Sequence, residues 1–331
     1  MATYRGPTAA ELARRRRRFR RRRARALGLL ALLAGFLVLT KLIQPSYDEH
    51  GLQGLAIGAL PLALAAVAQA IVVISGGIDL SIGSMMALTS VVAASQMLGQ
   101  SEGFGVAVVI GVLALGLVLG AINGTLVVIT RVPDIVVTLA MSFVWAGCAL
   151  LVLNRPGGGS STWLKEIIKG SLGNEWVPRA AIVLIVVIAA IWIPLRRSKA
   201  GLRIYAVGSD RLAAFRSGVS VGRTKVLAYA LLGLFAALGG LSLTASTGIG
   251  TPVPGPYTLL SVAAVVLGGV SLAGGRGGIV GPLIAVAILQ LIRTDMTFLR
   301  FDPNLAVVVQ GVILIGVVMV GSLVQLRRQR G

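Results

Sequence analysis

Long uninterrupted stretches of apolar residues, separated by short segments rich in glycine, proline or charge, run along almost the whole chain. A helix needs about 20 apolar residues to cross the roughly 30 Å hydrocarbon core of a bilayer. The stretches are continuous rather than alternating, so they favour helices over the strands of a membrane barrel. The pattern therefore predicts an all-α integral membrane protein with about ten transmembrane helices, near 26–43, 54–74, 80–98, 104–125, 135–153, 180–195, 226–246, 258–274, 279–293 and 305–324.

The composition agrees with a membrane protein. Apolar residues make up 56% of the 331 positions and charged residues 13%, and the mean hydropathy is +0.90. Charged residues are about twice as frequent in soluble domains, so the composition argues against a water-soluble fold of this size. Cys148 and His50 are the only residues of their types, and neither has a metal-ligand or nucleophile partner in register. We therefore expect no metal site, no disulfide within the chain and no catalytic centre.

Charge divides the chain into one polytopic domain, 26–324, and two basic tails, 1–25 and 325–331. When the N-terminus is placed in the cytoplasm and the helices alternate, most of the 31 Lys and Arg residues fall on the inner side, as the positive-inside rule requires. This assignment makes 196–225 a cytoplasmic loop, 154–178 an external loop and both termini cytoplasmic. The net charge of +20 then reflects topology rather than nucleic-acid binding.

The arginine-rich tail followed by the apolar stretch 27–43 admits two interpretations. It has the charge and length of a cleaved signal peptide, but no small-x-small cleavage pattern follows the apolar stretch. We therefore predict a retained first helix. Its arginines are expected to bind anionic headgroups of the inner leaflet, at about 1 kcal/mol per residue near the surface.

The segment Ser75–Ser84, between the second and third stretches, combines three glycines with Asp79. A carboxylate at membrane depth faces a cavity, a partner charge or exposed helix-end N–H groups, and broken helices line the paths of many transporters. Two interpretations stay open: Asp79 caps the third helix by accepting from the backbone near Ile82, or it contacts a transported solute. A weaker copy of the segment lies at 268–275, where Ser271 occupies the position of Asp79.

Small and polar residues within the apolar stretches predict helix contacts. Gly116, Gly120 and Gly124 follow a four-residue spacing that lets another helix approach closely. Asn123 and Gln69 form either interhelical hydrogen bonds or solute contacts. Polar groups next to helix breaks or on inward faces are the candidates for a solute path: Gln69, Ser75, Asp79, Ser81, Ser84, Asn123, Thr138 and Ser271.

The cytoplasmic loop contains a short helix-compatible stretch that Asp210 can start and Gly218 can end. A small helix with flanking arginines is a plausible knob for a groove on a soluble partner, and the alternative is a solvated loop helix. On the first interpretation, Ala214→Glu uncouples the partner and leaves the chain folded. The residues of the predicted knob are Asp210, Arg211, Ala213, Ala214, Phe215, Arg216 and Gly218.

Four segments resemble the ribose-type carbohydrate permeases of ATP-binding-cassette importers, a group related to branched-chain amino acid permeases. They cover most of residues 55 to 320, whereas the arginine-rich N-terminus has no counterpart in that family. The segments are SGGIDLSIGSMMALTSVVAA at 75–94, INGTLVV at 122–128 with RVPDIVVTLAM at 131–141, AAFRSGVSVGRTKVLAYALLGLFAALGG at 213–240, and AAVVLGGVSLAGGRGGIVGPLIAVAIL at 263–289.

The resemblance implies a type II-like permease of a bacterial cytoplasmic membrane, which makes no covalent bond itself. Such a permease pairs with a second copy or a close paralogue, with two cytoplasmic ATPases that use ATP and Mg²⁺, and with an extracytoplasmic solute-binding protein. It implies that 209–218 is the coupling helix that docks on the ATPase, and that this chain binds no cofactor. The family usually has Asn-Glu at Asp210-Arg211, and often a proline at Asp134, so this chain departs from it at both places.

Two other functions stay open. An ion-coupled secondary transporter would use Asp79 as its proton or sodium site and would need no ATPase. A permease for branched-chain amino acids would keep the same partners and change the solute.

Overall fold

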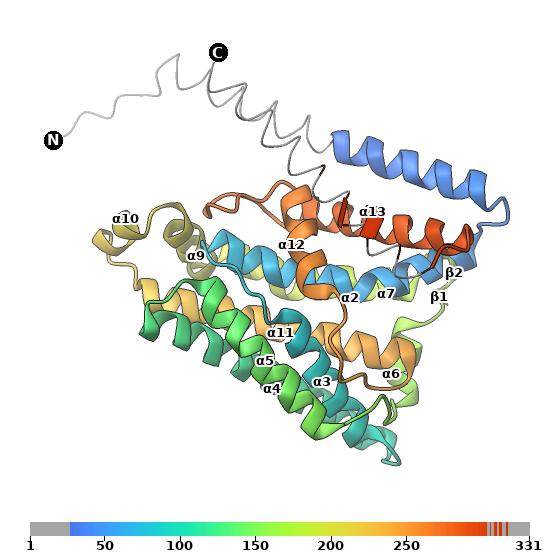
Figure 1. Cartoon of the computed structure of the whole chain (residues 1–331), viewed down its shortest axis with the longest axis horizontal. Coiled ribbons are helices and arrows are strands. Elements are labelled where there is room, and N and C mark those ends of the chain that lie inside the picture. Colours follow the sequence, from blue (N-terminus) through green and yellow to red (C-terminus); the bar gives the residue numbers. More distant parts are fainter. Residues whose placement is uncertain (1–26, 303–304, 306–307, 310, 313–315, 317–331) are drawn as a thin grey trace.

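The computed structural model describes residues 27–302 together with 305, 308, 309, 311, 312 and 316 (Figure 1). The predicted tails, 1–25 and 325–331, lie outside the described residues, as does most of the helix predicted at 305–324. Within the described part the chain is almost wholly helical, as predicted. Its elements are the helix Leu27–Ile43, α2 (Glu49–Ile74), α3 (Ile82–Met97), α4 (Glu102–Thr130), α5 (Asp134–Val152), α6 (Thr162–Ile168), β1 (Ser171–Leu172), β2 (Asn174–Pro178), α7 (Arg179–Val187), the π-helical turn η1 (Ile188–Trp192), α8 (Ile193–Arg197), α9 (Lys199–Ser209), α10 (Arg211–Arg216), α11 (Val221–Thr247), α12 (Tyr257–Leu267) and α13 (Val280–Phe298).

Six helices in the described residues are long and apolar enough to cross a bilayer: α2, α4, α5, the continuous helix Arg179–Arg197, α11 and α13. The helix Leu27–Ile43, α3 and α12 are apolar but shorter. At 1.5 Å per residue, the 16 residues of α3 span about 24 Å and the 11 residues of α12 about 16 Å. The described chain therefore does not confirm the predicted number of about ten full spans.

The prediction of one helix over 258–274 is wrong at its C-terminal end, because α12 stops at Leu267. Gly268 ends the helix and Gly269 adopts a left-handed conformation, with φ of +77°. Glycine enters this region without steric cost, and such a residue commonly terminates a helix. Here the local backbone preference of two glycines overrides a continuing apolar pattern.

The helices α2, α3 and α11 form the centre of the bundle. In the most apolar stretch of each helix, 83% of the residues of α2 and 61% of those of α11 are buried, against 33% in α4, 22% in α5 and 11% in Arg179–Arg197. The outer helices expose large apolar side chains such as Ile129, Phe143 and Leu151. An apolar outer surface suits a lipid environment and would be costly in water.

The glycine stripe of α4 packs directly on α11, which confirms the predicted close helix contact. A Cβ atom added at Gly116 or Gly120 would overlap the carbonyl oxygens of Gly233 and Tyr229, and Gly124 lies against the backbone of Val226. Only glycine lets two helix backbones approach to this distance.

The segments between helices gather at two ends of the bundle (Figure 1). At one end lie α9, α10, the residues between α2 and α3, and the residues between α12 and α13. Arg211 Nη2 donates to the carbonyl oxygen of Gly76 at 3.0 Å, and the amide of Gly275 donates to that of Ile74 at 2.8 Å. Every segment of this end was predicted to share the inner side of the membrane.

The opposite end holds the segments predicted to be external. Gln53 Nε2 donates to the carbonyl oxygen of Glu175 at 2.9 Å, and the Glu102 carboxylate accepts from the amide of Thr162 at 3.0 Å. This end also contains a departure from the all-α prediction, the antiparallel pair β1 and β2. Gly173, with φ of +73°, turns the chain between the two short strands.

Candidate functional site

Loop 75–81 leaves α2 through a glycine-dependent turn. The amides of Gly76 and Gly77 donate to the carbonyl oxygens of Val73 and Val72, each at 3.0 Å, and Gly76 has φ of +80°. These two bonds with one left-handed residue define a Schellman motif, which satisfies carbonyls at the end of a helix. The chain then turns back beside α2 instead of continuing as one helix.

Loop 268–279 leaves α12 through the same motif, which supports the predicted repeat. The amides of Gly269 and Val270 donate to the carbonyl oxygens of Val266 and Val265 at 2.9 and 3.1 Å. The left-handed residues Gly76 and Gly269 correspond, so the two loops are offset by one residue from the predicted alignment. In backbone position Ser271 therefore matches Ile78 rather than Asp79, and the prediction on this point is wrong.

Asp79 lies at the centre of a buried hydrogen-bond network, here called the Asp79 cluster. Its Oδ1 accepts from the amide and the hydroxyl of Ser81 at 2.6 and 2.7 Å, and its Oδ2 accepts from Asn123 Nδ2 at 3.2 Å. Asn123 Nδ2 also donates to the Ser81 hydroxyl, at 2.7 Å, and Asn123 Oδ1 accepts from Trp145 Nε1 at 3.2 Å. With its amide in the orientation that satisfies both partners, Gln69 donates to the Asp79 carbonyl oxygen at 3.1 Å and accepts from the Asp79 amide at 3.2 Å.

This cluster joins loop 75–81 to α2, α4 and α5. Asp79, Ser81, Asn123 and Gln69 are all fully buried. Of the interpretations left open, the geometry supports the capping role of Asp79, with the amide of Ser81 as donor at the start of α3. It also supports an interhelical bond for Asn123, with Trp145 of α5, whereas Gln69 bonds the backbone of loop 75–81. Trp145 was not predicted, because an indole within an apolar stretch has no pattern that reveals its partner.

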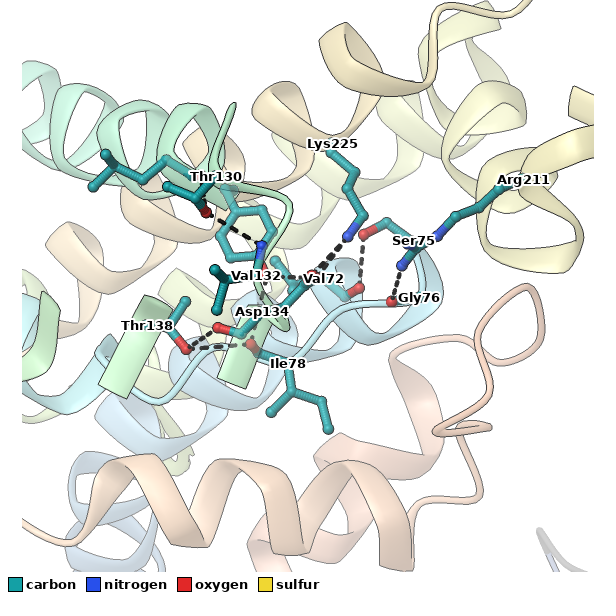
Figure 2. Close-up of polar contacts among 12 residues, drawn as sticks. Val72, Ser75, Gly76, Ile78, Thr130, Val132, Asp134, Thr138, Arg211 and Lys225 are labelled. Atoms are coloured by element: carbon teal, nitrogen blue, oxygen red, sulfur yellow. Dashed lines mark hydrogen bonds and ion pairs between the residues drawn. The ribbon is translucent and has the colours of Figure 1, made fainter. Parts of the chain in front are cut away.

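A buried ion pair lies next to the same loop (Figure 2). Lys225 Nζ donates to Asp134 Oδ1 and Oδ2 at 2.9 and 2.7 Å, and the Tyr229 hydroxyl donates to Asp134 Oδ2 at 3.0 Å. The lysine and aspartate side chains are only 6% and 14% exposed. Gly77 packs against Asp134 Oδ2 and the Tyr229 hydroxyl, so the pair supports the loop backbone directly.

The ion pair was missed by the sequence analysis. One sequence feature could have revealed the pair: Lys225 and Asp134 each begin an apolar stretch, on the same predicted side of the membrane. Asp134 was noted only as a departure from the family pattern. Its neighbour Thr138 accepts from the amide of Leu80 at 3.0 Å and donates to the Asp134 carbonyl oxygen at 2.9 Å, so a predicted path residue also holds the loop.

The remaining predicted path residues lie apart from the Asp79 cluster. Ser75 donates to the carbonyl oxygen of Val72 in its own helix, at 2.7 Å. Ser84 is buried near the start of α3. Ser271 lines a cavity of about 260 Å³ at the end of the molecule that holds α9, together with Ser209, Ala273, Gly274 and Arg276.

The N-termini of α3 and α12 meet inside the bundle. The amide of Gly83, in the first turn of α3, donates to Thr258 Oγ1, in the first turn of α12, at 3.0 Å. The chain reaches α12 along α3, because Gly250 packs on Val91 and Gly255 lies near Gly83. Paired N-termini of discontinuous helices are typical of transporter sites, where their N–H groups and dipoles face the solute.

The predicted knob is a helix, α10, with the predicted ends. Asp210 Oδ1 accepts from the amide of Ala213 at 2.9 Å, and Gly218, with φ of +78°, follows the helix. Two large apolar side chains of α10, Leu212 and Phe215, are 57% and 67% exposed. Ala214 is only 6% exposed and faces the body of the protein, so only Ala213 of the two predicted knob alanines is exposed.

Residues 51–318 match the family model described as branched-chain amino acid transport system / permease component. The chain is 35% identical over 264 residues to the ribose import permease protein RbsC of Escherichia coli (strain K12), which covers 78% of this chain and 82% of that protein. It is 33% identical to RbsC of Bacillus subtilis (strain 168), over 84% of this chain and 87% of that protein. It is 32% identical to the fructose import permease protein FrcC of Rhizobium meliloti, over 75% and 71% of the two chains. No solved structure matches the chain.

Proposed function

This chain belongs to the family of permease components of branched-chain amino acid transport systems, and from that membership we propose that it is the membrane-spanning subunit of an ATP-binding-cassette importer for a monosaccharide or a related solute. The sugar is inferred from the relatives that import ribose and fructose. The single observation of this molecule that carries the mechanism is α10, a short helix at one end of the bundle with two exposed apolar side chains.

Leu212 and Phe215 form the surface that we assign to the ATPase. They project from a helix at the end where most of the described Lys and Arg residues gather, which is the cytoplasmic end by the positive-inside rule. Exposed apolar side chains away from the lipid-facing helices are costly unless a partner covers them. A second permease copy, two ATPases that bind ATP and Mg²⁺, and an extracytoplasmic solute-binding protein complete the proposed importer. The chain itself binds no cofactor in this proposal, and both termini are cytoplasmic.

Sodium coupling through Asp79 is a weaker alternative. A sodium site offers several oxygen atoms to the cation, whereas the Asp79 carboxylate is surrounded by the donors Ser81 N–H, Ser81 O–H and Asn123 N–H. These donors already stabilise a negative charge without a cation. Transport of a branched-chain amino acid stays the second candidate, because the matching family model carries that description.

Uptake into proteoliposomes tests the proposal. The chain is reconstituted with its ATPase and solute-binding subunits, and uptake of labelled D-ribose, D-fructose and L-leucine is measured with and without internal ATP. We expect uptake of a sugar that requires both ATP and the binding protein. Uptake driven by a sodium or proton gradient in the absence of ATP would exclude the importer, and uptake of leucine alone would change the solute class.

The docking surface has its own test. Leu212→Ser/Phe215→Ser removes the two exposed apolar side chains of α10 and is expected to abolish co-purification of the ATPase subunits. Leu202→Ser is the matched control, since Leu202 is a 71% exposed leucine of the adjacent helix α9. Equal ATPase recovery from the double variant and the control would contradict docking through α10.

A further inference from the structure

Three chain segments meet backbone to backbone where α9 ends. The last carbonyl oxygen of α2, that of Ile74, accepts from the amide of Gly275 in loop 268–279 at 2.8 Å. Gly208 of α9 packs onto the same carbonyl, and a Cβ atom added to it would overlap the Ile74 oxygen and lie 2.7 Å from the Gly275 nitrogen. One carbonyl group therefore contacts both α9 and the second loop.

Glycines make this contact possible on every side. A Cβ atom added to Gly274 would lie 2.9 Å from the Cα of Gly76 and 2.6 Å from the Gly208 oxygen, and one added to Gly275 would overlap Ser209. Gly76, Gly274 and Gly275 all have positive φ, which side chains other than glycine rarely adopt. We call Gly76, Gly208, Gly274 and Gly275 the glycine junction.

Two side chains add to the junction from α9 and α10. Arg211, the first residue of α10, donates from Nη2 to the carbonyl oxygen of Gly76 at 3.0 Å (Figure 2). Tyr205, one turn before the end of α9, donates from its hydroxyl to the carbonyl oxygen of Gly277 at 3.0 Å. Only Asp210 separates α9 from α10, so the two helices form one arm that holds both loops.

The far ends of these loops lead to the parts of the molecule with the features of a solute path. Loop 75–81 continues from Gly76 to the Asp79 cluster and the start of α3, and loop 268–279 contains Ser271 and leads to α13. Contacts between backbones have no flexible side chain to absorb a displacement, because packed protein interiors are stiff. A shift of the arm therefore has to move both loops or break these contacts.

We propose that the glycine junction is the element that transmits ATPase closure to both broken-helix loops at once, with Gly208 and Arg211 as positioning residues. This inference rests on the proposed docking of the ATPase on α10. The proposal gives Arg211 a different role from the predicted one: its guanidinium is directed at Gly76, so it transmits the movement to loop 75–81 and does not bind the ATPase. Leu212 and Phe215 then bind the ATPase, whereas Gly208 and Arg211 convey the movement.

The test separates assembly from coupling in the complete importer. Gly208→Ala inserts a methyl group between α9 and the Ile74 carbonyl, and Gly147→Ala is the control, because a Cβ atom there meets nothing within 4 Å. For Gly208→Ala we expect normal recovery of the ATPase subunits with at least a tenfold loss of the ATP hydrolysis stimulated by loaded binding protein, a size within the usual range of coupling energies. The control is expected to match the wild type.

Arg211 supplies a second test that does not disturb helix packing. Arg211→Met keeps much of the side-chain length without a donor, and Arg211→Lys keeps a charged donor on a side chain one atom shorter. Stimulated hydrolysis and D-ribose uptake are expected to fall with methionine and recover in part with lysine, at equal ATPase recovery.

The outcomes distinguish this inference from the proposed function. Full stimulation in both Gly208→Ala and Arg211→Met would overturn the junction, even if Leu212→Ser/Phe215→Ser still loses the ATPase. Loss of ATPase recovery in Arg211→Met would also overturn it, because Arg211 would then be a docking residue. Retained ATPase recovery in Leu212→Ser/Phe215→Ser would instead refute the docking proposal itself.

Discussion

Removal of one member of the buried Asp134–Lys225 pair is the most direct test of what holds loop 75–81. Lys225→Met keeps the length of the apolar stem and removes the charge. Asp134 then retains only the Tyr229 hydroxyl as a side-chain donor to its carboxylate, in a position where the carboxylate is 14% exposed. A buried carboxylate without its cation is among the most destabilising single changes in a protein.

The expected magnitude follows from the geometry. At the 2.7 Å separation of Lys225 Nζ and Asp134 Oδ2, the Coulomb attraction is about 6 kcal/mol for an effective dielectric constant near 20. Desolvation of both groups offsets much of this attraction, so the pair adds little net stability. Breaking it nevertheless costs roughly 3–5 kcal/mol, because the remaining charge stays buried. We expect a cost of that size for Lys225→Met and a similar cost for Asp134→Asn.

The double variant Asp134→Asn/Lys225→Met removes both charges and keeps an oxygen that accepts from Tyr229. It is expected to recover most of the loss and to unfold within about 1–2 kcal/mol of the wild type, since a neutral buried pair is often nearly as stable as an ionic one. Equilibrium unfolding in mixed detergent micelles, followed by tryptophan fluorescence, gives the four free energies of the cycle.

Two results would refute this reasoning. If Lys225→Met unfolds within about 1 kcal/mol of the wild type, the carboxylate is not effectively buried and the pair has the energy of a surface ion pair. If the two single variants and the double variant are additive, the residues do not interact across the 91 positions that separate them.

Three further predictions concern helix packing, the Asp79 cluster and α10. Gly120→Ala is expected to lower the unfolding free energy by about 1–3 kcal/mol, because its Cβ atom would overlap the Tyr229 carbonyl, whereas Gly111→Ala faces open space and is expected to be neutral or slightly stabilising. Asn123→Leu leaves Trp145 without its acceptor and Asp79 Oδ2 without its donor from Asn123, and is expected to cost about 2–4 kcal/mol in the same unfolding assay, while Thr125→Val, an exposed position on the same helix, is expected to stay within about 0.5 kcal/mol. Ala214→Glu buries a carboxylate against the body of the protein and is expected to lower the melting temperature, whereas Ala213→Glu on the exposed side is not. Equal stabilities within any of these pairs would contradict the contact concerned.

The positions of the helices could be predicted because each depends on local hydrophobicity, and the ends of α10 because Asp210 and Gly218 act within one turn. The sorting of the loops to two ends could be predicted because a chain that crosses a bilayer repeatedly must alternate. The end of α12 could not, since the apolar pattern continues through Gly268 and Gly269 while the backbone turns.

Contacts between distant segments were the part that sequence patterns did not reveal. Trp145 lies in an apolar stretch that would pass for an ordinary span, and Lys225 is the last residue of the predicted cytoplasmic loop. Only the fold brings them to Asn123 and Asp134. A single polar residue in such a stretch indicates that a partner exists, because an unsatisfied group is costly there. It does not indicate which helix supplies that partner. The burial of Ala214 was missed for a related reason, since a helix of six residues is too short for its periodicity to identify the buried face.

The structure also divides the residues predicted for the solute path. A side chain whose polar group already bonds to its neighbours has to share or exchange that bond to contact a passing solute. Gln69, Ser75, Asp79, Ser81, Asn123 and Thr138 all use their side-chain groups in hydrogen bonds that hold loop 75–81 or its helices. Within the described part of the chain, the hydroxyls of Ser84 and Ser271 make no such bond. Ser84 and Ser271 are therefore the predicted path residues with a hydroxyl that needs no exchange of such a bond in this conformation, one where the N-termini of α3 and α12 meet and one in the loop that the glycine junction holds. Direct solute contact stays a prediction for all eight residues.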